Sequence, residues 1–258
     1  MLKKLALLFC TFFAAAASAA SGTALVVGPG LGTENYMNTK LAAAGYTVTV
    51  STSGIPSGSL SNYKQIWDVR FQNQLTSSEI SNYVAYLQGG GSLFLLGEGT
   101  QVPLRNSSIF DVVIAAGGQV TSSGFTLANN NQTVNAPFNS NKNTISTVTY
   151  AYCGGIPIGD IGSATAITQD SANLATALRW GPGTMTSATS GTLITVFDVN
   201  PIYTGTDQPL FIENLIEYLA APSGAPTTPA AVPTLGEWGM IFLASLLAMF
   251  GIRRMRRQ

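Results

Sequence analysis

The stretch SLFLLGEG (residues 92–99) contains the strongest candidate for a buried strand in the chain. Four apolar residues in succession, followed by a Gly-Glu-Gly turn, are typical of a strand that is covered on both faces. A similar run, ALVVG (residues 24–28), also ends in glycine. These two runs predict a parallel sheet with helices on both of its faces.

Helical patterns alternate with these strands. Residues 75–91 begin with Thr76 and Glu79, which have the spacing of a capping box, and end in three glycines. Further helices are predicted over 33–45, 107–118 and 208–220, and further strands over 46–50, 64–69, 164–169, 175–180 and 191–200. The predicted inward-facing residues are Tyr36, Met37, Leu41 and Ala44 in the first helix, Ile80, Val84 and Leu87 in the second, and Leu210, Phe211, Leu215, Ile216 and Leu219 in the last. The alternation predicts a doubly wound α/β fold with a mostly parallel sheet.

Residues 119–150 have a different composition from the rest of the chain. They are rich in Asn, Thr and Ser, and they end in the alternating stretch TISTVTY (residues 144–150). Alternation of this kind favours strands with one exposed face. We therefore expect an antiparallel insertion in this region.

The first 20 residues have the parts of a secretory signal peptide. Lys3 and Lys4 precede an apolar stretch, and Ala17-Ser18-Ala19 fits the small-x-small rule for cleavage, with a site one residue later as an alternative. Residues 1–20 are therefore predicted to be removed by signal peptidase during export through the inner membrane. The competing interpretation is an N-terminal core helix or a membrane anchor.

The last part of the chain combines a linker, an apolar segment and a cluster of arginines. Residues 221–232 are rich in Pro, Ala and Thr, which is typical of an extended linker. Residues 238–252 carry no charge, and they are followed directly by Arg253, Arg254, Arg256 and Arg257. An apolar segment flanked by arginines predicts a single transmembrane helix with its arginines in the cytoplasm. An ordinary C-terminal helix of the fold is the alternative.

This tail resembles the IPTL-CTERM sorting signal of Gram-negative bacteria. The residues that carry the resemblance are Val232, Pro233, Thr234, Leu235, Trp238 and Gly239, together with the terminal arginines. The resemblance covers residues 233–258 and Val232 before them, and Val232 replaces the usual isoleucine. It implies processing by an exosortase-type membrane protease, delivery of the body to the cell surface, and a producer with an envelope rich in exopolysaccharide.

The charge and the cysteine count of the body exclude some classes of function. Residues 21–231 contain six lysines and arginines against eleven acidic residues, a net charge of minus five. A mildly acidic body without a basic patch argues against binding of nucleic acid. Because Cys153 is the one cysteine beyond the signal peptide, no disulfide is expected within the body.

Residues 21–220 resemble a class I glutamine amidotransferase-like domain, which has a flavodoxin-like fold. The stretches that carry the resemblance are ALVVG with LAAAGYTVTV, the region from LSNYKQIWDV to LFLLGEG, and FDVNPIYTGTDQPLFIENLIEYL. Catalytic members have a nucleophilic cysteine in a Gly-x-Gly turn and a histidine that activates it. Glu98 stands in the matching turn, and the chain contains no histidine. A Cys–His or Ser–His relay is therefore excluded, as are the usual His-based zinc sites.

Three acidic residues, Asp68, Glu98 and Asp198, end predicted strands. Ligands of open α/β sheets bind beyond the carboxyl ends of the strands, so the three residues are candidates for a shared crevice. Asp68 and Glu98 could act as an acid–base pair on a glycoside, or the carboxylates could hold a hard cation such as calcium. The competing interpretation is that each carboxylate caps a helix or binds loop amides.

Other residues are weaker candidates. Cys153 is expected to be a buried thiol, since no histidine can lower its pKa. Residues 28–32 (GPGLG) resemble a phosphate-binding loop but are more typical of a tight turn. Four aromatic residues are candidates for a sugar-stacking platform, with a place in the core as the alternative: Trp67, Trp180, Tyr150 and Tyr152.

The sequence therefore predicts an exported protein with a non-catalytic α/β domain that binds a component of the envelope. A carboxylate-dependent hydrolase that uses Glu98 and Asp68 is the alternative, and an adhesive module stabilised by a cation is a third possibility. No cofactor is predicted apart from the option of calcium.

Overall fold

The computed structural model describes residues 22–121, 125–203 and 208–221. The chain divides into two compact units, Met1–Ala225 and Pro226–Gln258, and every described residue belongs to the first. The predicted signal peptide, most of the linker and the predicted transmembrane segment lie outside the described residues. Within the described ranges, no helix combines the length and the apolar character that a membrane span requires.

Five parallel strands form one half of the sheet. Their spatial order is β2 (Tyr46–Ser51), β1 (Gly22–Val27), β3 (Gln65–Asp68), β4 (Ser92–Leu96) and β11 (Thr192–Val196). Counted along the chain among these five, the order is 2-1-3-4-5, which is the order of flavodoxin-like sheets. The α/β class predicted from the sequence is confirmed.

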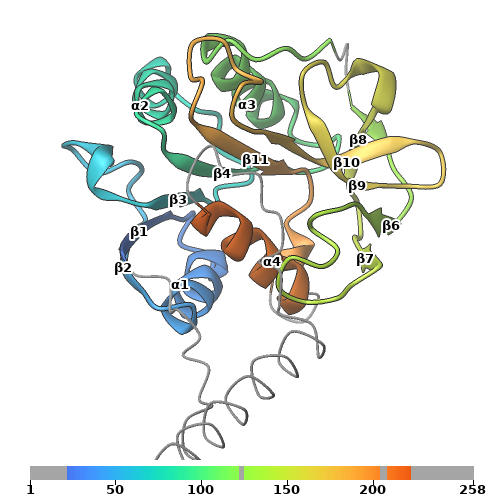
Figure 1. Cartoon of the computed structure of the whole chain (residues 1–258), viewed down its shortest axis with the longest axis horizontal. Coiled ribbons are helices and arrows are strands. Elements are labelled where there is room, and N and C mark those ends of the chain that lie inside the picture. Colours follow the sequence, from blue (N-terminus) through green and yellow to red (C-terminus); the bar gives the residue numbers. More distant parts are fainter. Residues whose placement is uncertain (1–21, 122–124, 204–207, 222–258) are drawn as a thin grey trace, which may run out of the picture. The chain divides into compact units, whose positions relative to one another are not determined.

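Helices cover both faces of this sheet. On one face, α1 (Thr33–Ala43) and α4 (Pro209–Ala220) pack into a core cluster with residues such as Val26 and Phe94. On the other face, α2 (Ser77–Gln88) and α3 (Pro103–Ala115) pack into a second cluster. In Figure 1 the first pair lies below the strands and the second pair above them. This two-sided covering explains why the strand residues of SLFLL are all buried.

The other half of the sheet is antiparallel. Beyond β11 the order continues with β10 (Leu174–Trp180), β9 (Thr165–Gln169), β6 (Asn131–Val134) and β7 (Thr147–Thr149). The two short strands off this path are β5 (Thr126–Leu127) and β8 (Gly154–Pro157). The antiparallel part is therefore larger than the predicted insertion over 119–150, because the strands predicted at 164–169 and 175–180 also belong to it. Three short 3₁₀ turns complete the described elements: Leu60–Asn62, Ile158–Asp160 and Asn200–Ile202.

The beginning of α2 follows the sequence signals closely, whereas α3 begins at Pro103, four residues before the predicted Ser107, because Pro103 suits the first turn of a helix. The buried faces of α2 and α4 differ in part from the prediction. The capping box of α2 is present, with reciprocal hydrogen bonds between Thr76 and Glu79. On the same helix Tyr83, Tyr86 and Leu87 are buried, whereas the predicted Ile80 and Val84 are only half-buried. The predicted apolar stripe of Ile80, Val84 and Leu87 omits the two tyrosines. Their rings pack inward although their hydroxyl groups are polar.

The predicted inward face of α4 contains one error. Leu210 is 48% exposed, and Ile212 is buried in its place. Leu210 lies in the first turn of α4, directly after Pro209. It therefore precedes the part of the helix that packs against the sheet.

Candidate functional site

The three predicted site acids lie at one edge of the sheet. Asp68 is the last residue of β3, and Glu98 and Asp198 each follow the end of their strand, β4 or β11, by two residues. Since β3, β4 and β11 are neighbours in that order, the three carboxyl ends are adjacent. The side chains nevertheless lie in two different environments.

Asp68 is enclosed in a network of positive charges. Its carboxylate accepts hydrogen bonds from Arg70 Nη2 at 2.7 Å and from the Tyr83 hydroxyl at 2.9 Å. Arg105, which is fully buried on α3, places Nη2 at 3.4 Å from the other carboxylate oxygen. Arg70 also pairs with Glu79 at 2.7 Å. The network therefore contains two arginines and two carboxylates.

The network determines the charge state of Asp68. Burial on its own would raise the pKa of this carboxyl, but the charges of Arg105 and Arg70 and the hydrogen bonds from Arg70 hold it below its ordinary value. Asp68 is fully buried and ionised. It therefore differs from the prediction that it faces an open crevice together with Glu98.

Glu98 and Asp198 lie close enough to interact as like charges. The Glu98 carboxylate accepts hydrogen bonds from the amides of Gly99 at 2.8 Å and Val199 at 3.2 Å. The Asp198 carboxylate accepts the amides of Ala151 and Tyr152 at 3.0 and 3.2 Å. Its second oxygen accepts the backbone amide and the side-chain amide of Asn200. Both carboxylates are thus bound to loop amides, as in the competing interpretation of these residues.

The environment of this pair raises the pKa of both groups. Burial raises the pKa of Glu98 to about 7, and the charge of Asp198 adds to the shift, while the two amide hydrogen bonds oppose it. Burial also raises the pKa of Asp198 above its ordinary value, against the opposing hydrogen bonds. Glu98 therefore changes protonation near neutral pH, whereas Asp68 does not.

The segment 150–154 covers the turn that contains Glu98. A Cβ atom added to Gly99 would lie 2.1 Å from the carbonyl oxygen of Tyr152, so the two backbones are in close contact. The amide of Gly154 donates a hydrogen bond to Phe197 O at 3.0 Å. Together with the bonds from Asp198, these contacts fix the segment over the Gly-Glu-Gly turn. The segment therefore packs against the position of the nucleophile in the amidotransferase resemblance, where Glu98 is half-buried.

Cys153 lies in the same segment and is fully buried. Burial raises the pKa of its thiol to about 12, and the nearby negative charge of Asp198 contributes. Its sulfur lies 3.8 Å from Gln132 Nε2 and 3.5 Å from the carbonyl oxygen of Asn129. A thiol with this pKa is not a nucleophile at neutral pH, which fits the expectation of a buried thiol.

The glycine-rich turn after β1 is filled by a side chain of the protein. The Glu34 carboxylate accepts the amide of Gly32 at 3.1 Å, and a Cβ atom at Gly28 would lie 2.4 Å from the Cβ of Glu34. Glu34 is 4% exposed. A carboxylate of the protein therefore already takes the amide of Gly32 at the start of α1, which a bound phosphate would need.

Most of the candidate aromatic platform belongs to the core. Trp67, Trp180 and Tyr150 are buried, and Trp67 stacks on Phe94 with 4.5 Å between the ring centroids. Tyr152 alone among the four candidates is exposed, at 64%. The interpretation as core residues therefore applies to three of the four.

Within the part of the chain that the structure describes, no group of three or more His, Cys, Asp or Glu residues is arranged to hold a metal ion. Asp68, Glu98 and Asp198 do not form such a group. Their oxygen atoms bind arginines, a tyrosine and backbone amides.

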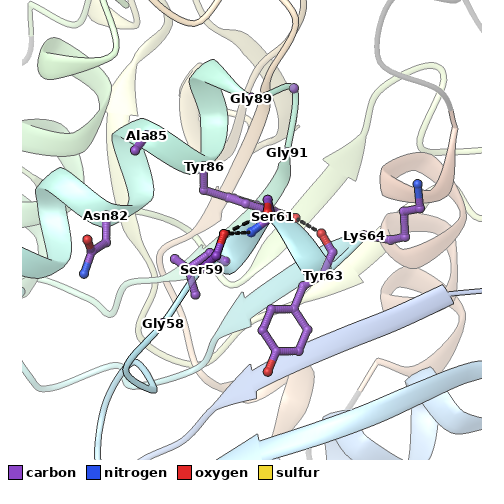
Figure 2. A pocket seen from close by; sticks show the side chains of 12 residues that line it. Gly58, Ser59, Ser61, Tyr63, Lys64, Asn82, Ala85, Tyr86, Gly89 and Gly91 are labelled. Carbon is purple, nitrogen blue, oxygen red and sulfur yellow. Dashed lines mark hydrogen bonds between the residues drawn. The ribbon is translucent and has the colours of Figure 1, made fainter.

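A pocket lies at the opposite edge of the sheet, here called the amino edge, where β3 and β4 begin. It has a volume of about 330 Å³ and is formed by the segment before β3, the last two turns of α2 and the three glycines after α2 (Figure 2). The lining residues are Gly58, Ser59, Leu60, Ser61, Tyr63, Lys64, Asn82, Ala85, Tyr86, Gly89, Gly90 and Gly91. This pocket was not among the sites predicted from the sequence. The serine-rich segment 57–61 and the glycine triplet 89–91 were the available signals.

The C-terminal part of the chain matches the model of the IPTL-CTERM motif over residues 230–257. The sorting signal inferred from the sequence is therefore supported over nearly the same residues. No curated protein matches the chain.

Solved structures are similar to the body at low sequence identity. The mmIFT52 N-terminal domain has a TM-score of 0.55 and 12% identity, and the match covers 79% of this chain and all of that one. A putative ThuA-like protein from Bacteroides uniformis has a TM-score of 0.52 and 13% identity, covering 77% and 91% of the two chains. The carbohydrate deacetylase Agd3 has a TM-score of 0.50 and 14% identity, covering 77% of this chain and 32% of that one. At these identities the similarities establish the fold alone.

Proposed function

We propose that the chain is the precursor of a surface-sorted protein whose α/β domain binds a component of the cell envelope and catalyses no reaction. The IPTL-CTERM match over residues 230–257 carries this proposal. In it, residues 1–20 direct export and are removed by signal peptidase, residues 21–220 form a glutamine amidotransferase-like domain, and residues 221–232 form a linker. Residues 233–258 anchor the precursor in the inner membrane until an exosortase-type protease processes it.

The absence of catalysis is supported by the chemistry of the Gly-Glu-Gly turn. The chain contains no histidine, and Glu98 stands where the amidotransferase resemblance requires a cysteine. The segment 150–154 contacts this turn directly, and the thiol of Cys153 has a pKa raised to about 12. These features leave no activated nucleophile at the carboxyl edge.

Deletion of residues 233–258 tests the sorting part of the proposal. The truncated protein is expected in the periplasm or the medium, whereas the complete protein is expected in the membrane and surface fractions. A variant in which Arg253, Arg254, Arg256 and Arg257 are replaced by glutamine separates the cationic stop from the apolar segment. An unchanged surface fraction after the deletion contradicts the proposal.

A carboxylate-dependent hydrolase remains the alternative, and the pKa of about 7 at Glu98 is the observation in its favour. A carboxyl group with this pKa can donate a proton near neutral pH. Asp68 does not fit the role of the partner carboxylate in an acid–base pair with Glu98, because two arginines already neutralise its charge. Turnover of a glycan by the purified body, lost in a folded Glu98→Gln variant, would replace the binding proposal with this alternative.

A further inference from the structure

We propose that the pocket at the amino edge of the sheet, here called the amino-edge groove, binds a neutral saccharide unit of the envelope. The inference rests on the proposed binding function and adds its site and ligand class. Its volume of about 330 Å³ lies at the lower end of the range of about 300–1,000 Å³ for small-molecule sites, which suits one or two sugar units.

The groove has a floor that is fixed in place. The Tyr86 hydroxyl donates a hydrogen bond to Tyr63 O at 3.0 Å and accepts one from the amide of Ser92 at 3.3 Å. A Cβ atom at Gly91 would lie 2.4 Å from the Tyr86 ring, so a glycine is required for the ring to pack there. Figure 2 shows Tyr86 reaching from α2 toward Ser61 and the backbone of Tyr63. The shape of the floor therefore does not depend on a bound ligand.

The lining has the chemistry of a site for hydroxyl groups. Ser59 and Ser61 are exposed, and their hydroxyls lie 2.8 Å apart, so each keeps capacity for a further hydrogen bond. Asn82 is exposed on α2 and contributes an amide that both donates and accepts. Ala85 and the glycines leave small apolar areas between these polar groups. A sugar presents hydroxyl groups and small apolar faces in the same combination.

The charge of the lining favours a neutral ligand. Among the described residues that line the groove, Lys64 is the one lysine, and the lining contains no arginine, aspartate or glutamate. Figure 2 shows its ammonium group directed away from Ser59 and Ser61, and its stem runs beside Gly22. An acidic sugar in the groove would therefore lack a directed cationic partner.

The groove lies at the edge of the sheet where the described part of the body begins and ends. Gly22, the start of β1, lies against Lys64, which precedes β3, and Gln65 at the start of β3 donates a hydrogen bond to Ile216 O on the last turns of α4. Both ends of the folded body thus lie at the amino edge.

Titration of the purified body with neutral trisaccharides tests the assignment. We would follow the backbone amides by NMR with gluco-, galacto- and manno-configured trisaccharides, and use trigalacturonate as the acidic probe. Shifts are expected for Ser61, Asn82 and Gly90 with at least one neutral trisaccharide. Ala85→Trp fills the groove and should abolish the shifts, whereas Ser81→Trp, exposed on the same helix outside the lining, should retain them. Asn82→Ala should weaken binding about two- to tenfold, the effect of one hydrogen bond.

Three outcomes overturn the inference: no neutral trisaccharide binds, Ala85→Trp binds as well as the unmodified protein, or trigalacturonate binds more tightly and Lys64→Gln removes the difference. A separate assay measures binding of the body to isolated envelopes. If that binding persists in Ala85→Trp, the proposed function stands and the groove assignment fails. If envelopes do not bind the unmodified body at all, the proposed function fails as well.

Discussion

Two carboxyl groups that end neighbouring parallel strands behave in opposite ways. Asp68, after β3, is bound by Arg70, Arg105 and Tyr83, and its pKa is held below the ordinary value. Glu98, after β4, accepts the backbone amides of Gly99 and Val199 and lies near Asp198, and burial raises its pKa to about 7. Both residues lie at the carboxyl edge of the sheet, although Asp68 ends its strand and Glu98 follows its strand by two residues. The difference teaches that the surrounding charges determine what a carboxyl group at this edge can do.

The comparison predicts that the largest effect comes from breaking the Asp68 network. Asp68→Asn removes the partner of two arginines, of which Arg105 is fully buried. An unpaired buried charge of this kind costs about 3–5 kcal/mol of unfolding free energy. Urea unfolding of the body measures this loss.

Asp111→Asn is the matched control, because Asp111 is exposed on α3. It should change the unfolding free energy by less than about 0.5 kcal/mol. The network has a second signature, since a carboxyl with a lowered pKa contributes stability above its unfolded value and loses it as the pH falls. Equal stability losses for the two variants would show that the Asp68 network is not a stabilising unit.

The second prediction concerns the pH dependence of Glu98. Its folded pKa of about 7 lies above the ordinary value of 4.5, so the folded state loses stability as the pH rises from about 4.5 to about 7. Glu98→Gln removes this loss. Relative to the unmodified protein, the variant should gain roughly 3 kcal/mol between pH 4.5 and pH 8.

The change with pH is the informative quantity, because glutamine also loses one amide hydrogen bond at every pH. Thermal unfolding at several pH values measures it, with Glu217→Gln on the exposed side of α4 as the control. A Glu98→Gln curve parallel to that of the unmodified protein would mean that Glu98 is already ionised at pH 5. The contrast with Asp68 would then disappear.

Much of the fold could be predicted because its signals are local. The buried run at 92–96, the capping box of Thr76 and Glu79, and the glycine after α1 each determine structure within a few residues. The extent of the antiparallel half could not be predicted in the same way. Strands β9 and β10 have buried residues on both faces, so their periodicity does not distinguish antiparallel from parallel pairing.

The candidate site could be predicted only in part, because its environment depends on contacts distant in sequence. Arg70 lies two residues after Asp68, but Arg105 comes from α3, 37 residues away. The covering of Glu98 depends on the segment 150–154, which belongs to the other half of the sheet. The acidic residues at strand ends predicted correctly that Asp68, Glu98 and Asp198 lie at one edge of the sheet. They did not reveal which carboxylates were already bound.

The third prediction tests the contact between the segment 150–154 and the Gly-Glu-Gly turn. Gly99→Ala would place a Cβ atom 2.1 Å from the carbonyl oxygen of Tyr152, so the segment 150–154 must move. Overpacking of this kind costs about 1–3 kcal/mol. The displaced segment should expose Cys153, which is otherwise buried. Faster modification of Cys153 by a thiol reagent in the folded protein measures the movement.

Gly159→Ala is the control for this substitution, because a Cβ atom at Gly159 meets no atom within 4 Å. It should leave both stability and thiol modification almost unchanged. If Gly99→Ala destabilises the protein while Cys153 stays protected, the turn moves and the segment does not. The covering segment would then be held by its hydrogen bonds to Asp198 and Phe197, and not by its contact with the turn.

The smallest predicted effect concerns the capping box of α2, which shares Glu79 with the Asp68 network. Glu79 accepts the amide of Thr76 at 2.9 Å and pairs with Arg70 at 2.7 Å. Thr76→Ala removes the hydroxyl that accepts the Glu79 amide and donates to the Glu79 carboxylate, and it should cost about 1 kcal/mol. Ser78→Ala, exposed in the first turn, should cost little. If Glu79 couples the helix cap to the Asp68 network energetically, Thr76→Ala should lower the free energy of unfolding less in an Asp68→Asn background than in the unmodified protein. Additive losses in the double variant would show instead that the cap and the network stabilise the protein independently.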